Sequence, residues 1–123
     1  MQDHKSIVAW QEAHEVARAA LRSCRLLWKP YATALFGQLQ RSSLSVQLNI
    51  AEGYALRSPK RFYYHLQVAY GSAVETAELL ELALEEDLLP DSEGQAMLAR
   101  CRRTQSLLLG LLRRYRPSTS PPP

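Results

Sequence analysis

The stretch QLQRSSLSVQLNIAE, residues 38–52, decides the fold, because its apolar and polar side chains separate into two faces only on a helix. Starting from Leu35, its core-facing positions recur every 3 or 4 residues: Leu39, Ser42, Val46 and Ile50. A polar stripe with the same period runs beside them, made of Gln38, Arg41, Ser45, Asn49 and Glu52. The stretch therefore predicts a helix over residues 32–52 that buries one face.

The same periodicity recurs outside this stretch, and the helix breakers fall between the periodic segments. Apolar residues at helical spacing predict three further helices, over residues 7–28, 59–87 and 92–115. Pro30 ends the first of these, and Ser58 with Pro59 begins the next as N-cap and first helical residue. Four helices with short connections predict an all-α fold, an antiparallel up-down-up-down four-helix bundle over residues 1–116.

Three small residues and the tail carry more specific expectations. Gly53 is expected just past the end of the second helix, in the left-handed conformation. Gly71, inside the third helix, is expected to allow close approach of a neighbouring backbone. Asp91 or Ser92 is expected to cap the fourth helix, with Ser92 forming a capping box with Gln95. The Pro- and Ser-rich residues 117–123 have nothing to bury and are predicted to form a disordered tail.

The bulk composition bounds the class of protein. The 123 residues fit one domain, and 46% hydrophobic with 22% charged residues is typical of a globular protein. No apolar run reaches the ~18 residues that a bilayer requires, and no signal-peptide pattern is present, so we expect a cytoplasmic protein without a membrane span. Cys24 and Cys101 are interpreted as reduced core thiols, with a disulfide or metal pair as the alternative.

The net charge of +3 is small, but the charges are segregated along the chain. Residues 75–93 contain acids without bases, and residues 96–116 contain arginines without acids. Two interpretations stay open: the charged faces neutralise one another within a bundle or between subunits, or a basic surface binds RNA or DNA. The candidate nucleic-acid contacts are cations of the first and fourth helices: Arg18, Arg22, Arg25, Lys29, Arg100, Arg102, Arg103, Arg113 and Arg114.

The sequence offers no constellation that supports catalysis. His14-Glu15 begins like the zinc motif HExxH, but Arg18 stands where the second histidine is required. There is no GxSxG, no phosphate-binding glycine loop and no Glu-x-x-His pair of the kind that holds two metals in a bundle. We therefore expect no catalytic residue, no metal and no cofactor, and a protein that acts by binding and assembly.

The polar stripe is the candidate site. Because it lies beside the core-facing positions, part of it is expected to be buried and hydrogen-bonded. Glu52 stands at a helix C-terminus, where the dipole disfavours an anion, so Arg57 or Lys60 is expected near it. We interpret eight residues as a network that fixes helix register: Gln38, Arg41, Ser45, Asn49, Glu52, Gly53, Arg57 and Lys60. The alternative is a polar site open to a ligand or a nucleic-acid backbone.

Three segments together carry a family resemblance. They are Val8-Ala9-Trp10-Gln11 with Ala13-His14; Gln38-Leu39-Gln40-Arg41 with Ser45 and Asn49-Ile50-Ala51-Glu52-Gly53; and Arg57-Ser58 with Lys60, Phe62, Leu66, Ala69, Gly71-Ser72 and Glu75. Over roughly residues 7–90 the chain resembles the four-helix bundle proteins of the 23S rRNA intervening-sequence type. That family is related to the accessory variability protein of diversity-generating retroelements.

The resemblance implies more than the residues do by themselves. It implies a homopentamer around a central channel, basic surfaces that bind RNA or DNA, and a reverse transcriptase as partner in the retroelement branch. The expected function is therefore a non-enzymatic oligomeric bundle that binds nucleic acid through basic helix faces. The alternative is a purely structural or protein-interaction oligomer, such as an accessory subunit to a reverse transcriptase.

Overall fold

The structure, a computed structural model, describes residues 3–118, which form four long α-helices and two short 3-10 helices. The long helices are α1 (Val8–Leu27), α2 (Thr33–Ala55), α3 (Pro59–Glu85) and α4 (Asp91–Tyr115). The 3-10 helices η1 (His4–Ser6) and η2 (Pro30–Ala32) precede α1 and α2. The described residues contain no strand, so the predicted all-α class is confirmed.

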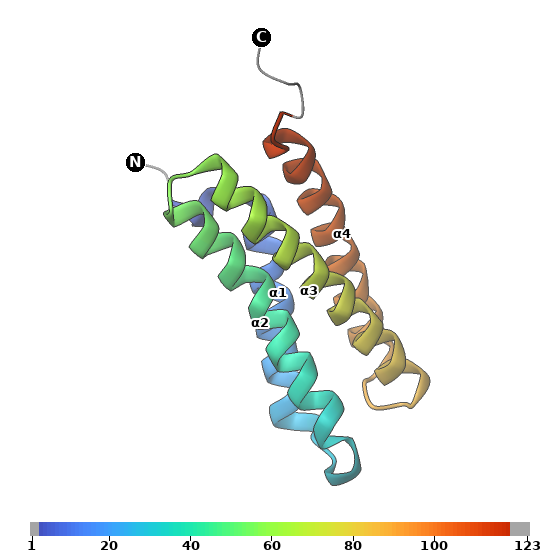
Figure 1. Cartoon of the computed structure of the whole chain (residues 1–123). Coiled ribbons are helices and arrows are strands. Elements are labelled where there is room, and N and C mark those ends of the chain that lie inside the picture. Colours follow the sequence, from blue (N-terminus) through green and yellow to red (C-terminus); the bar gives the residue numbers. More distant parts are fainter. Residues whose placement is uncertain (1–2, 119–123) are drawn as a thin grey trace.

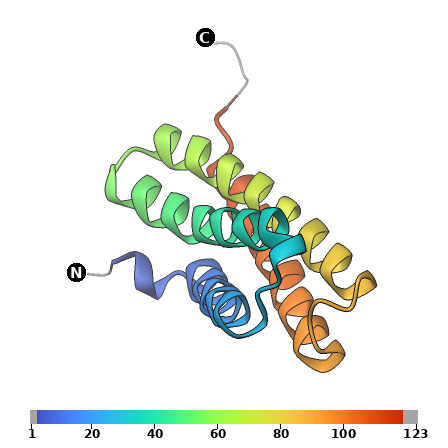
Figure 2. The same cartoon turned by 90° about the horizontal axis from the view of Figure 1, so that it is seen from below.

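The four helices pack against one another side by side. Each packs on the next one in the sequence, and α4 also packs on α1. The α1–α2 and α3–α4 connections lie at the lower end of the molecule in Figure 1, and the α2–α3 connection lies at the upper end with the last turn of α4. In Figure 2, α2 lies between α1 and α3, and the backbones of α1 and α3 make no close contact. α1 and α3 therefore lie diagonally opposite each other in the bundle.

The core consists of two apolar clusters, one above the other. The lower cluster contains, among others, Val16, Ala20, Cys24, Phe36, Leu39, Ala77, Leu80, Ala83 and Cys101. The upper cluster contains Ala9, Ala13, Val46, Ile50, Phe62, Leu66, Ala69, Ala73 and Leu108. A layer of buried hydroxyl side chains separates the two: Ser42, Ser43, Thr76 and Thr104. Full burial of a leucine such as Leu66 or Leu80 contributes roughly 1.5–3 kcal/mol, so these clusters supply most of the stabilisation.

The prediction that α2 ends at Glu52 with a left-handed Gly53 is wrong. α2 continues through Ala55, Gly53 is buried within it, and no glycine of the described residues has a positive φ. The left-handed residue is Arg57, with φ 56°. Gly53 is required for a different reason, because a Cβ built on it would lie 2.6 Å from the Cβ of His65 on α3.

Two other local expectations are also corrected. An added Cβ at Gly71 would have no atom within 4 Å, so no backbone of the described residues uses the space expected there. Ser92 lies inside α4, whose N-cap is Pro90 and carries no side-chain hydrogen bond. By contrast Ser58 caps α3 as expected, accepting a hydrogen bond from the backbone N–H of Arg61 at 3.3 Å.

The chain continues past α4 in a non-helical segment. Most of the predicted disordered tail, from residue 119 onward, lies outside the described residues. Across the described helices, none has the length and apolar character to cross a membrane.

Candidate functional site

Side-chain hydrogen bonds join α2 to α3 along the predicted polar stripe. Three pairs bridge the two helices: Gln38–Glu75 at 3.0 Å, Ser45–Ser72 at 2.8 Å and Asn49–His65 at 2.9 Å. Within α2, Asn49 Nδ2 donates to the carbonyl oxygen of Ser45 at 2.9 Å. Arg41 is exposed and donates to Gln38 Oε1 at 2.9 Å. We call this row the polar seam.

A buried hydroxyl pair continues the polar seam into the core. Thr76 is fully buried, and its Oγ1 lies 2.8 Å from Ser42 Oγ and 2.7 Å from the carbonyl oxygen of Ser72. A buried hydrogen bond contributes only about 1 kcal/mol, but leaving such a hydroxyl unpaired costs about 1–3 kcal/mol. Only one register of α3 against α2 pairs all of these groups, so the seam favours that register over sliding or rotation.

The remaining residues predicted for the network lie at the upper end and do not extend the seam. Glu52 is exposed, and no salt bridge within residues 3–118 includes it. Lys60 is exposed, and the guanidinium of Arg57 lies over the ring of Tyr54 at 5.3 Å. The structure therefore does not bring Glu52 into the expected ion pair, and Gly53 belongs to the site only through its contact with His65.

Three of the candidate arginines lie in the middle of α4 and face carboxylates. Arg102 forms a salt bridge with Glu81 of α3. Arg100 and Arg103 share Glu12 of α1, at 3.7 and 3.9 Å. These acids offset much of the charge that a phosphate would otherwise meet, so the middle of α4 is a poor anion site.

The cations of α1 form a separate exposed row. Arg18, which pairs with Glu15 of the same helix at 3.2 Å, is followed by Arg22 and Arg25 at helical spacing. We call these three the basic row. All three line an open hollow of about 610 Å³ between α1 and α2, together with Leu21, Cys24 and Gln40. Lys29 lies beyond the helix, next to η2.

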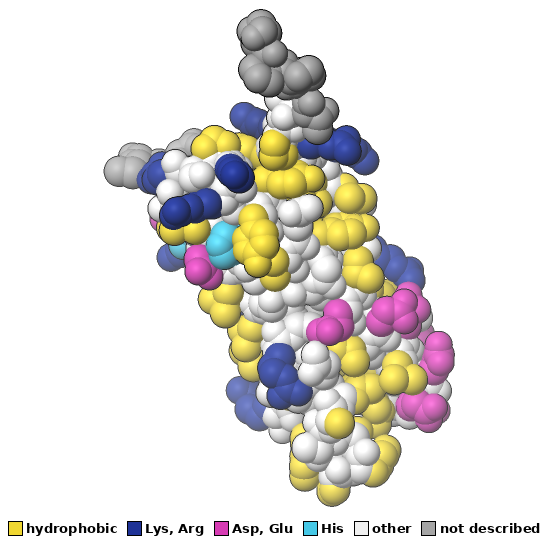
Figure 3. Space-filling view, viewed as in Figure 1, with side chains coloured by type: hydrophobic (Ala, Val, Ile, Leu, Met, Phe, Trp, Pro, Cys, Tyr) yellow, Lys and Arg dark blue, Asp and Glu magenta, His cyan; other side chains and the backbone are white. Residues whose placement is uncertain are grey.

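The upper end of the bundle gathers cations from four segments of the chain. They are Lys5 of η1, Arg57 of the α2–α3 connection, Lys60 and Arg61 of α3, and Arg113, Arg114 and Arg116 at the end of α4. All are exposed. Figure 3 shows dark blue side chains around this end, with a magenta side chain beside them at the upper left and most of the magenta ones on the lower right. Phe62 and Tyr115 hold the segments together, with ring centroids 4.9 Å apart. We call these seven residues the basic end.

The sequence pattern identifies only part of the basic end. It marks Arg113 and Arg114 as candidates for nucleic-acid contact but not Lys5 or Arg61, and it assigns Arg57 and Lys60 to the polar network. The available signal is that cations flank both the α2–α3 connection and the end of α4. Whether these ends meet depends on helix length and direction, which the charge pattern does not contain.

The sequence matches the model of a known family. The family described as the 23S rRNA-intervening sequence protein matches residues 5–110 of the chain. The chain belongs to this family. The match includes the polar seam and the basic row, and ends before Arg113 and Arg114. No curated protein matches the chain.

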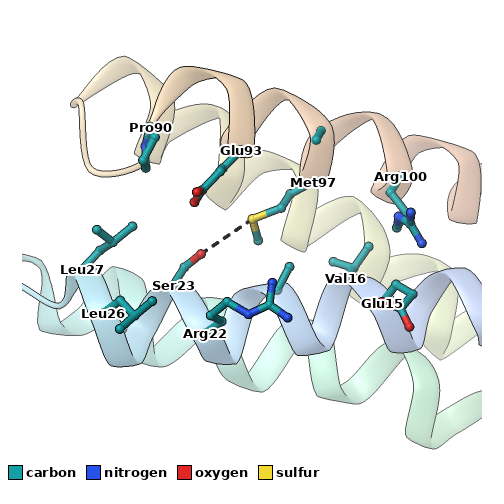
Figure 4. Close-up of a pocket in the computed structure, with 12 residues that line it drawn as sticks. Glu15, Val16, Arg22, Ser23, Leu26, Leu27, Pro90, Glu93, Met97 and Arg100 are labelled. Atoms are coloured by element: carbon teal, nitrogen blue, oxygen red, sulfur yellow. Dashed lines mark hydrogen bonds between the residues drawn. The ribbon is translucent and has the colours of Figure 1, made fainter.

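A groove with an apolar floor lies between α1 and α4 of this family member. It has a volume of about 430 Å³, an apolar floor that includes Val16 and Met97, and a charged rim: Glu15, Arg22, Glu93 and Arg100 (Figure 4). Its one hydroxyl, that of Ser23, donates to the sulfur of Met97 at 3.8 Å. Its apolar floor and charged rim suit the groove to holding an apolar group.

The other reactive groups of the described residues are also arranged for structure. No group of three or more His, Cys, Asp or Glu side chains within residues 3–118 is placed to hold a metal ion. Both cysteines are free and buried, as expected. Burial raises the pKa of the Cys24 thiol, and raises that of Cys101 to about 11, so both thiols stay protonated and unreactive near neutral pH.

Proposed function

We propose that the protein is a non-enzymatic, cytoplasmic bundle protein that assembles into a ring and holds RNA or DNA at its basic end. The binding is through phosphates, so it is weakly sequence-specific and falls steeply with salt. The four helices of each copy run up-down-up-down in this proposal. The proposed ring is a homopentamer, as membership of the family suggests.

The observation that carries this proposal is the convergence of cations at the upper end. Lys60, Arg61, Arg113 and Arg114 come from two different helices, and none of them takes part in a salt bridge of the described residues. A cluster of cations that are not held in salt bridges creates a local positive potential that attracts a polyanion. The mid-α4 arginines, in contrast, are held by Glu12 and Glu81.

An aromatic side chain lies beside these cations. Tyr64 is 62% exposed and stands one helical turn after Lys60 on α3. An exposed ring next to cations is able to stack on an unpaired base, which adds affinity for single-stranded segments. The basic end therefore suits RNA with loops or bulges better than a uniform duplex.

The alternative function is a structural or protein-interaction oligomer without nucleic-acid affinity, such as an accessory subunit to a reverse transcriptase. The salt bridges of the described residues favour it, because they pair Arg18, Arg100, Arg102 and Arg103 with the protein's own acids. Under this alternative the family fold serves assembly alone.

An RNA-binding measurement with matched variants separates the two. Fluorescence anisotropy with a labelled RNA hairpin compares the triple variant Arg61→Gln, Arg113→Gln, Arg114→Gln with the control Arg100→Gln, Arg102→Gln, Arg103→Gln. Each triple variant reduces the formal net charge from +3 to 0, so the two differ only in position.

The basic-end variant is expected to lose at least ~10-fold in affinity, and its salt dependence to weaken by roughly 0.7–0.9 in logarithmic slope for each phosphate that the protein no longer neutralises. The control is expected to bind nearly as the wild type does. If both variants bind equally, charge alone and not the basic end explains the binding. If the wild type has no affinity for the hairpin at low salt, the proposal is wrong and the alternative holds.

A further inference from the structure

The outer face of α1 is charged and apolar at once, and nothing within residues 3–118 covers it. The basic row of Arg18, Arg22 and Arg25 is interrupted by Leu21, whose side chain is 45% exposed. Leu21 therefore leaves much of its apolar surface exposed within the single chain. The hollow of about 610 Å³ beside it, between α1 and α2, is open to the outside.

The outer face of α3 repeats this pattern with the opposite charge. Glu78, Glu81 and Glu85 follow one another at helical spacing, interrupted by Leu82, which is 46% exposed. We call the three glutamates the acidic row. Among the described residues, only Glu81 of this row has a salt-bridge partner, Arg102. Positions 18, 21, 22 and 25 on α1 have the same spacing as 78, 81, 82 and 85 on α3, with the leucine second in the first set and third in the second.

The two rows also lie at the same height of the bundle. Val16, Ala20 and Cys24 beside the basic row, and Ala77, Leu80 and Ala83 beside the acidic row, all belong to the lower core cluster, so both rows lie in the lower half of the bundle. The chain runs from the upper to the lower end in both α1 and α3 (Figure 1). Each row spans about seven residues, or about 10 Å of helix. The rows therefore match in length, level and direction.

The rows cannot meet inside one molecule. α1 and α3 are diagonal and their backbones make no close contact, with α2 between them in Figure 2. A second copy, turned about an axis parallel to the bundle, is able to present its α3 to the α1 of the first. Such a contact joins two different surfaces, so it repeats from copy to copy and closes into a ring when the rotation allows.

We propose that the basic row of one copy packs against the acidic row of a second copy, with Leu21 and Leu82 in contact at the centre. The ridge that carries Leu82 enters the hollow beside α1, and the arginines on either side of Leu21 face the glutamates on either side of Leu82. The contact rests on the assembly proposed above, and identifies the surfaces that build it. It leaves the basic end uncovered and available to nucleic acid.

The experiment is a charge swap measured by size-exclusion chromatography with light scattering, without nucleic acid. The first variant is Arg22→Glu with Arg25→Glu, and the second is Glu78→Arg with Glu85→Arg. The third combines all four substitutions in one chain. The matched control is Arg113→Glu with Arg114→Glu, which makes the same change of charge at the basic end as the first variant makes on α1. Circular dichroism verifies that every variant keeps its helices.

Both double variants are expected to raise the dissociation constant of the assembly at least ~100-fold, because like charges then face each other across the contact. The fourfold variant is expected to assemble as the wild type does, since both charges are exchanged, and the control is expected to assemble normally. Raising salt is expected to weaken assembly of the wild type, because the charge pairs are exposed at its edges.

Two results overturn the proposal in different ways. If the folded double variants assemble as the wild type does, the contact is elsewhere, while assembly and nucleic-acid binding both stand. If the wild type is monomeric at a protein concentration well above that of the RNA assay, the contact and the proposed ring both fail. RNA binding by the wild type, measured separately from assembly, then shows whether the basic end still holds nucleic acid.

Discussion

Alanine substitution is expected to have opposite effects at Gly53 and Gly71. Both glycines lie inside helices, so both substitutions gain intrinsic helix propensity, about 1 kcal/mol in a helix interior. They differ in what the new methyl group meets. At Gly71 the space is empty within 4 Å, whereas at Gly53 the methyl carbon would lie 2.6 Å from His65 Cβ and 3.1 Å from Phe62 Cδ1.

The contact at Gly53 is too short to relieve by a side-chain rotation. Cβ of His65 is fixed to the backbone of α3, so α3 has to move away from α2 by about 1 Å for an ordinary carbon–carbon distance of roughly 3.5–4.0 Å to be restored. Such a movement stretches the Asn49–His65 hydrogen bond, now 2.9 Å. Overpacking of a core costs about 1–3 kcal/mol and the gain in propensity offsets about 1 kcal/mol of it, so Gly53→Ala is expected to lower the free energy of unfolding by up to about 2 kcal/mol.

Urea unfolding followed by circular dichroism measures both effects. With a denaturant slope of about 1–3 kcal/mol per molar, each kcal/mol shifts the midpoint by roughly 0.3–1 M. The midpoint of Gly71→Ala is expected to rise and that of Gly53→Ala to fall, at unchanged slope. Measuring at two protein concentrations separates folding from assembly. If Gly53→Ala proves as stable as Gly71→Ala, α2 and α3 are not as close at this point as the polar seam requires.

Three further predictions test single interactions. Ser58→Ala is expected to lower the free energy of unfolding by about 1 kcal/mol in thermal melts, because the N–H of Arg61 loses its cap, while Ser58→Asp is expected to retain the wild-type value. Thr76→Val is expected to cost about 1–2 kcal/mol in urea unfolding, since it deprives Ser42 of its 2.8 Å partner, and Thr76→Ser is expected to keep that bond. The Cys101 thiol, whose pKa burial raises from 9.0 to about 11, stabilises the fold fully below pH 9. As pH rises from 9 to 11, about 2–3 kcal/mol is expected to be lost in the wild type but not in Cys101→Ala, which unfolding at a series of pH values measures.

The helical periodicity of α2 could be predicted from the sequence, because the spacing of its apolar and polar residues identifies both faces of the helix. The core-facing positions Leu39, Val46 and Ile50 are buried, and the stripe beside them lies at the edge of that buried surface. A helix has a fixed period, so the position of one face determines the other. The all-α class and the place of the polar stripe at a helix interface follow from this geometry alone.

The partners of the stripe could not be read in the same way. His65 lies on another helix, and its pairing with Asn49 depends on how far α3 is rotated and shifted against α2. The glycines show the same limit, since Gly53 and Gly71 have equal local propensity. Only the neighbouring helix decides that the first is tightly packed and the second open. Spacing within one segment fixes faces, whereas contacts between segments require their relative placement.

The pairing of charges likewise depends on how the helices are placed relative to one another, and this dependence connects the two proposals. Acids and arginines on neighbouring helices already pair within the chain, as Glu81 with Arg102 and Glu12 with Arg100. The basic row and the acidic row lie instead on diagonal helices, where no pairing between them within the chain is possible. If copies meet through these rows about one common axis, every copy points its basic end to the same face of the ring. Weak phosphate contacts at each copy then act together on one nucleic acid, and linked sites bind far more tightly than one alone.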